Sequence, residues 1–208
     1  MRQCIAVLTA FLVAACSGGL RSNAPALHTY ILRAHAPAAA PATQPAGASV
    51  QVELPTSAPG LGSEHIVIVQ PDHRMSYYGG SEWAAELPRV VEELAVERLR
   101  ATGDWALVND STSAFSSDYF LQVRIRRFEA EYSGDAAPTA QVALDCAIGR
   151  RADRVVLASF TATGAAAASA NRVGAVIGAF ELAANAALDE VTAGSRAVLR
   201  SSQVPSNP

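Results

Sequence analysis

The N-terminus of the chain has the pattern of a bacterial lipoprotein signal peptide. Arg2 precedes an apolar run over residues 5–15, and the run ends in Ala14-Ala15-Cys16. Such a run suits the central region of a signal peptide and is too short to cross a bilayer as a helix. The sequence therefore predicts that residues 1–15 are removed and that the mature chain begins at a lipidated Cys16 outside the cytoplasm. An ordinary secretory signal with a chance cysteine is the alternative.

Length and charge restrict what the mature chain can be. The full chain has 208 residues, so the part after the signal suits one domain with a real core. Aromatic residues make up only 6% of the chain, so we expect a core of a few large side chains packed with alanine. The net charge is −3 and no long basic run occurs. Nucleic acid is therefore not an expected partner.

One cysteine remains to be explained after processing. Cys4 leaves with the signal peptide and Cys16 carries the lipid, so Cys146 has no partner for an intrachain disulfide. On an extended chain Cys146 shares a face with Val142 and Leu144. This pattern predicts a buried structural thiol and not a catalytic nucleophile.

Composition divides the chain into segments. Residues 16–28 are mostly small and polar and suit a tether between the lipid and the domain, which we place at 29–199. Residues 34–49 consist almost wholly of small residues, proline and glutamine, so they form either a linker or a long loop inside the domain. Residues 200–208 are predicted to form a disordered tail.

Hydrophobic periodicity predicts two helices, over 81–101 and 171–191, each with one apolar stripe. Gly194 is the predicted stop of the second helix. Pro88 either kinks the first helix or marks the first turn of a helix that begins later. Gly174 and Gly178 are spaced so that the second helix could lie close to a neighbouring element. Alternating or wholly apolar runs predict strands at 30–33, 50–54, 65–69, 105–108, 119–128, 139–148 and 154–161.

The order of these elements predicts an α+β fold. The last four strands are separated by short turns, which favours an antiparallel run, and both helices need one covered face. In the strand over 119–128, Phe128 falls on the face opposite to Leu121 and Ile125, so a bulge near Arg126-Arg127 would direct its ring inward. We expect a mainly antiparallel sheet with two helices packed on one face.

The sequence offers no recognisable catalytic or cofactor motif. It contains no Gly-x-Ser-x-Gly, His-Glu-x-x-His, phosphate-loop or dinucleotide-binding pattern. His65 and His73 flank a predicted strand, and Asp72 lies beside His73, but a metal site there would need a further ligand. We therefore predict no catalytic residue, no metal and no cofactor.

An aromatic cluster precedes the first predicted helix. Tyr77, Tyr78 and Trp83 surround Gly79-Gly80 in a chain that is poor in aromatic residues. Such a loop can contact a partner, and we take these three aromatic residues as the candidate partner contact. In the alternative interpretation, Trp83 covers the core and the tyrosines cover the helix start.

Taken together, the sequence resembles the PqiC-like ABC-type transport auxiliary lipoprotein family. The resemblance begins at the cysteine motif and covers nearly the whole mature chain. Its most specific elements are Trp-x-x-x-Leu-Pro at 83–88 and Arg-x-Phe-Glu at 126–129. The matching segments lie at 30–33, 77–78, 82–91, 118–130, 140–144 and 179–181.

The resemblance implies a non-enzymatic accessory lipoprotein of an envelope transport system. Its expected partners are an MCE-domain protein and an ABC permease and ATPase, and its expected cargo is phospholipid or another hydrophobic molecule. The stretch over 34–49 is then a loop inside the domain, and self-association into a homo-oligomer stays open. Ser17, where aspartate would favour inner-membrane retention in enterobacteria, points to the outer membrane. The alternative function is a structural envelope lipoprotein that assists outer-membrane assembly.

Overall fold

A computed structural model of the chain describes residues 26–35, 46–134 and 136–203. The signal peptide, Cys16, most of the tether and residues 36–45 lie outside this part. The elements in chain order are β1 (His28–Tyr30), β2 (Ala46–Val52), β3 (Thr56–Ser57), β4 (His65–Val69), β5 (Met75–Trp83), α2 (Leu87–Thr102), β6 (Trp105–Asn109), β7 (Tyr119–Glu131), β8 (Thr139–Arg150), β9 (Val155–Ala167) and α3 (Val173–Gln203).

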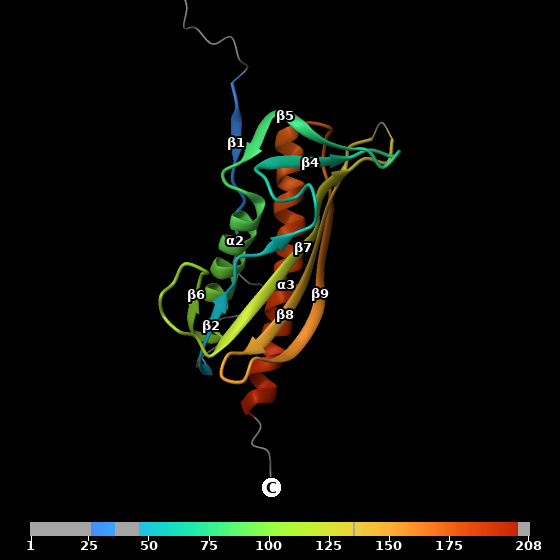
Figure 1. The fold of residues 1–208 in the computed structure, drawn as a ribbon. Coiled ribbons are helices and arrows are strands. Elements are labelled where there is room, and N and C mark those ends of the chain that lie inside the picture. Colours follow the sequence, from blue (N-terminus) through green and yellow to red (C-terminus); the bar gives the residue numbers. More distant parts are fainter. Residues whose placement is uncertain (1–25, 36–45, 135, 204–208) are drawn as a thin grey trace, which may run out of the picture.

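Strand β7 organises the sheet (Figure 1). One edge of β7 pairs antiparallel with β8 along its length, and β8 pairs antiparallel with β9. The other edge of β7 carries three parallel strands in succession, β2, β3 and β4. Beyond them, β6 pairs parallel with β2, β5 pairs antiparallel with β4, and β1 pairs parallel with β5.

The α+β fold with a mainly antiparallel sheet is confirmed, because the long ladders are antiparallel. The predicted antiparallel run of four strands was wrong in one place. Strand β6 lies beside β2 and not beside β7. Local turn patterns do not reveal this pairing, because β2 lies far from β6 in the sequence.

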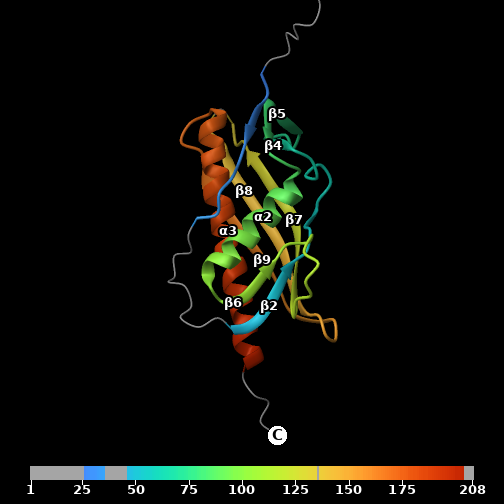
Figure 2. The same cartoon turned by 90° about the vertical axis from the view of Figure 1, so that its left-hand side faces the viewer.

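Both helices cover the same face of the sheet (Figures 1 and 2). The apolar side chains of α2, α3, β7 and β8 meet around one void of only about 10 Å³, at the lower limit for a single water molecule. The side chains around it are Val91, Leu94, Phe128, Val142, Leu144, Ala184 and Leu188. The interior is therefore filled, as the many buried alanines allow.

A β-bulge turns Phe128 into the core, as predicted. The register between β7 and β8 shifts between Ile125 and Arg127, which leaves Arg126 without a cross-strand partner. Phe128 is 1% exposed and stacks on Phe180 of α3 at a centroid distance of 5.2 Å. Trp83 of β5 stands edge-on to both rings, at 5.8 and 5.3 Å.

The first helix begins later than the predicted start at residue 81. Helix α2 starts at Leu87 with Pro88 in its first turn, where the missing N–H of proline costs no hydrogen bond. Residues 81–83, predicted as the helix start, form the end of strand β5 instead, because they pair with β1 and Glu82 also pairs with His65 of β4. Gly103, in the left-handed conformation at φ 65°, ends α2.

The second helix is longer than predicted, and it contacts the sheet at glycines other than the predicted Gly174 and Gly178. Helix α3 continues to Gln203, past the predicted end at 191 and into the segment expected to be a disordered tail. Gly194 does not stop the helix; a Cβ there would lie 2.4 Å from the ring of Phe160. The prediction for Gly174 and Gly178 was wrong, because open space surrounds both. The close approach of helix and sheet uses Gly164 of β9.

Two glycine substitutions test this packing. A Cβ at Gly164 would lie 1.9 Å from the backbone oxygen of Ala183, so Gly164→Ala should strongly destabilise the domain. Gly178→Ala meets no atom and should stabilise α3 by about 0.5–1 kcal/mol. Thermal unfolding of the two variants measures both effects. Equal melting temperatures would show that α3 does not lie against Gly164.

Candidate functional site

The three aromatic residues of the predicted contact lie on β5 and not in a loop, and they have three different environments. Trp83 is 1% exposed and belongs to the core with Phe128 and Phe180. The expectation that Trp83 contacts a partner is therefore corrected, because its ring is buried in the core. Strand alternation and its burial pattern place Trp83 and Ser81 inward at the end of β5.

Tyr78 is half-buried and joins the hairpin of β4 and β5 to the start of α3. Its hydroxyl lies 2.9 Å from that of Tyr132, which donates to Asn171 Oδ1 at 2.8 Å. Burial, together with the hydrogen bond to Tyr132, raises the pKa of Tyr78 above its usual range. Tyr78 therefore has a structural role as a neutral hydrogen-bonding group.

Tyr77 is the exposed member of the three. Its side chain is 46% exposed and its ring lies 4.8 Å from that of His65. Met75, two residues earlier on the same strand face, is 45% exposed. Met75, Tyr77 and His65 form the surface that we call the hairpin surface. Met75 belongs to the aromatic cluster that the sequence indicated, and the strand places its side chain on the face of Tyr77.

The hairpin surface lies on an open strand edge. Strand β1 pairs only with residues 81–83 of β5, so among the described residues no strand covers the edge from Met75 to Gly79. The register of β4 and β5 slips between His65 and Val67, and Gly80 at φ 66° accommodates the extra residues. An exposed edge with large side chains is a surface on which partner segments can bind.

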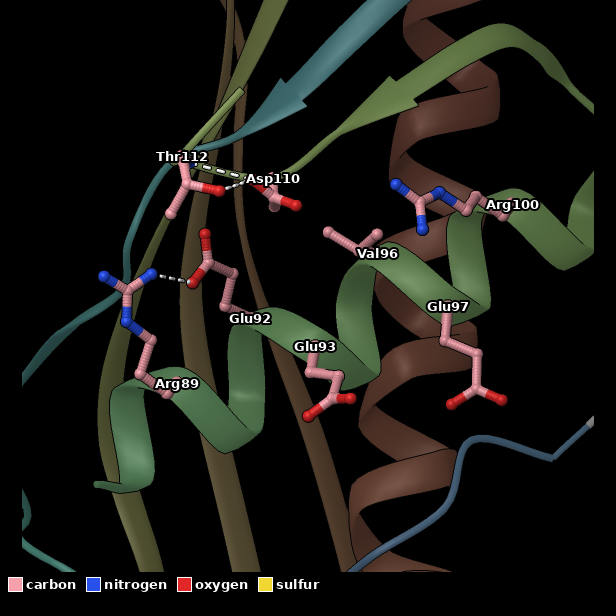
Figure 3. A pocket seen from close by; sticks show the side chains of 8 residues that line it. All are labelled: Arg89, Glu92, Glu93, Val96, Glu97, Arg100, Asp110 and Thr112. Atoms are coloured by element: carbon pink, nitrogen blue, oxygen red, sulfur yellow. Dashed lines mark hydrogen bonds and ion pairs between the residues drawn. The ribbon is translucent and has the colours of Figure 1, made fainter. Parts of the chain in front are cut away.

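A second feature is a polar pocket of about 510 Å³ between α2 and the connection from β6 to β7 (Figure 3). Glu92 is buried there; its two carboxylate oxygens accept hydrogen bonds from Arg89 Nη1 at 2.8 Å and from the N–H of Ser111 at 2.7 Å. Arg100 donates through Nε and Nη2 to the backbone oxygen of Val108. These bonds fasten the connection to the helix.

Asp110 of the same pocket is also satisfied within the protein. The hydroxyl and N–H of Thr112 donate to Asp110 Oδ1 at 2.6 and 2.8 Å, which lowers the pKa of that carboxyl. The pocket thus consists largely of neutralised or bonded charges. Sequence reasoning missed Glu92. Its partner Arg89 lies three residues earlier on the same helix, but its partner Ser111 lies on a connection whose position depends on the fold.

Among the described residues, the remaining potentially reactive groups are Cys146 and the dispersed His, Asp and Glu side chains. Cys146 is buried beside Val142 and Leu144, and burial raises the pKa of its thiol to about 12. Within residues 26–35, 46–134 and 136–203, no group of three His, Cys, Asp or Glu side chains gathers to bind a metal ion. No helix in those ranges is both long and apolar enough to cross a bilayer. The lipid-site prediction at Cys16 lies outside the described residues.

Solved structures share this fold. Protein XCC0632 from Xanthomonas campestris is 25% identical with a TM-score of 0.74, over 86% of this chain and 98% of that one. An uncharacterized protein matches at 13% identity with a TM-score of 0.62, over 83% and 98%. A PelC dodecamer from Paraburkholderia phytofirmans is 18% identical over 74% of this chain and 93% of that one, but its TM-score of 0.43 supports no argument about assembly here.

The sequence itself matches a family model. No curated protein matches the chain. The model for the ABC-type transport auxiliary lipoprotein component matches residues 30–191, from the end of β1 into α3. These residues include nearly all of the sheet, α2, the first part of α3 and the Trp83, Phe128 and Phe180 cluster. The chain therefore belongs to the family of ABC-type transport auxiliary lipoprotein components, which is a family of transport components and not of enzymes.

Proposed function

We propose that this auxiliary lipoprotein is a periplasm-facing subunit of an ABC/MCE-type system that moves phospholipids or other hydrophobic molecules. Its lipid is attached at Cys16, its anchor lies in the outer membrane, and it binds the MCE-domain protein of the system. The family match over residues 30–191 carries the proposal. The Ala14-Ala15-Cys16 motif supports lipid attachment at Cys16. Ser17 supports the outer membrane as the location of the anchor.

The arrangement of the domain supports a role through contacts with other subunits. The space between the helices and the sheet contains a void of only about 10 Å³, whereas binding sites for small ligands usually have several hundred Å³. A lipid molecule has no room inside this core. The domain can therefore assist transport by binding other components on its surface.

The hairpin surface is well placed for such a contact. The described chain begins at the end of the molecule that carries β1, β5 and the hairpin of β4 and β5 (Figure 1). Residues 16–25 can span at most about 35 Å when fully extended. The anchor therefore keeps Met75 and Tyr77 close to the membrane. There they can contact a transport complex that extends between the membranes.

The first test removes the lipid site. Cys16→Ala should leave unprocessed precursor or release the domain from the membrane, because the acyl chains supply the anchoring free energy at about 0.8 kcal/mol per buried CH₂. Membrane fractionation and mass spectrometry of the N-terminus measure the result. Correctly cleaved, fully membrane-bound protein from the variant would contradict the anchor.

The second test separates binding from stability at the hairpin. Tyr77→Ala should lower affinity for the MCE-domain protein about thirtyfold, the equivalent of about 2 kcal/mol for a central aromatic anchor, and leave folding intact. Tyr78→Phe is the control, since it loses a hydrogen bond worth about 1 kcal/mol in stability but should keep binding. Co-purification and thermal unfolding on one preparation measure both. Wild-type binding by folded Tyr77→Ala would remove the hairpin surface from the interface.

A further inference from the structure

The chain forms a groove where it leaves β1. Residues 30–35, which we call the strap, cross from β1 over α2 towards α3 (Figure 2). The strap and α2 enclose a groove of about 390 Å³. Leu94 and Val90 of α2 line it on one side, and Ile31, 54% exposed, lies on the other. This groove adjoins the polar pocket, with which it shares Glu93 and Glu97, and it lies outside the hairpin surface.

The strap is held in place by hydrogen bonds to both helices. Asn185 of α3 accepts from the N–H of His35 at 2.7 Å and donates to the backbone oxygen of Arg33 at 2.9 Å. Glu181 accepts from the N–H of Arg33 at 3.1 Å, and buried Arg98 of α2 donates to the backbone oxygen of His35. The groove therefore exists before a partner binds, which lowers the entropic cost of binding.

Two carboxylates at the rim of the groove have no partner in the part of the chain that the structure describes. Glu93 and Glu97 are exposed and one helical turn apart, and among the described residues neither makes a hydrogen bond or an ion pair. Figure 3 shows both carboxylates projecting towards the strap, away from Asp110 and Thr112. Their neighbour Glu92, by contrast, is buried and fully bonded.

Charge decides which occupant this groove fits. Arg33 is the only cation among the residues that line it, so with Glu93 and Glu97 the lining has an excess of one negative charge. An anionic membrane surface or a fatty-acid carboxylate would be repelled. A lysine or arginine side chain fits, because its aliphatic stem can lie on apolar surface while its cation reaches a carboxylate.

We propose that this groove binds a segment of a partner protein in which a lysine or arginine follows an aliphatic side chain. The aliphatic groups lie on Ile31, Val90 and Leu94, and the cation pairs with Glu93 and Glu97. This inference rests on the proposed function, in which the partner is the MCE-domain protein of the same transport system. The strap then connects partner binding to the lipid anchor, because it continues directly from β1.

The test uses the lipidated full chain and the purified MCE-domain protein. Glu93→Arg and Glu97→Arg should each weaken binding by at least about tenfold, and the wild-type affinity should fall as salt is raised. Glu190→Arg is the control for charge reversal, since Glu190 is also an exposed helical residue but lies outside both the groove and the hairpin surface. It should bind like the wild type.

Two further variants identify the mode of binding. Arg33→Gln removes the competing cation and should strengthen binding, whereas Ile31→Asn removes apolar surface and should weaken it. Unchanged binding by folded Glu93→Arg and Glu97→Arg overturns the inference and leaves the proposed function intact. No binding by the wild type overturns the proposed function itself. Should the reversals impair folding, the Glu93→Gln/Glu97→Gln double variant replaces them, and its unchanged binding likewise overturns the inference.

Discussion

The stack of Phe128 on Phe180, with Trp83 edge-on to both rings, is the interaction on which the rest of the structure depends. It joins β7, α3 and β5, three segments that are far apart in the sequence. Burying each ring contributes about 2–3 kcal/mol, and each aromatic contact about 1 kcal/mol more. The stack fixes where α3 lies on the sheet, and the strap is bonded to α3 through Asn185. The positions of the strap and of the hairpin surface on β5 therefore depend on this core.

The sequence predicted the parts of the fold that local patterns determine. Periodicity located both helices and most strands, and the misplaced face of Phe128 was enough to locate the bulge. Prediction from local patterns failed where tertiary contacts override the local preference of the sequence. The alanine-rich second half of β9 has low strand propensity, yet it extends to Ala167 because it pairs with β8 under α3. Gly194 looked like a helix end and is instead a point of contact with Phe160.

The candidate surfaces were predictable only in part. Two adjacent tyrosines and a tryptophan marked β5, but their spacing could not show that Trp83 is buried while Tyr77 is exposed. The register slip at Gly80 separates them, because strict alternation would place both on one face, and β5 itself was predicted as a loop followed by the start of a helix. The groove was beyond prediction, because one wall comes from residues 30–33 and the other from residues 84–97, which are about fifty residues away in the sequence. Both surfaces adjoin the chain segment around β1, so in the proposed function anchoring and partner binding share one end of the domain.

The most direct test of this account changes the bulge itself. Deleting Arg126 removes the residue without a cross-strand partner and should turn Phe128 to the outer face, with a loss of unfolding free energy of about 3–5 kcal/mol or no cooperative transition. Arg126→Ala keeps the bulge and removes only an exposed side chain, so it should cost under about 1 kcal/mol. Denaturant titration of both variants measures the difference. A deletion variant that unfolds cooperatively at the wild-type midpoint would contradict the dependence of the fold on Phe128.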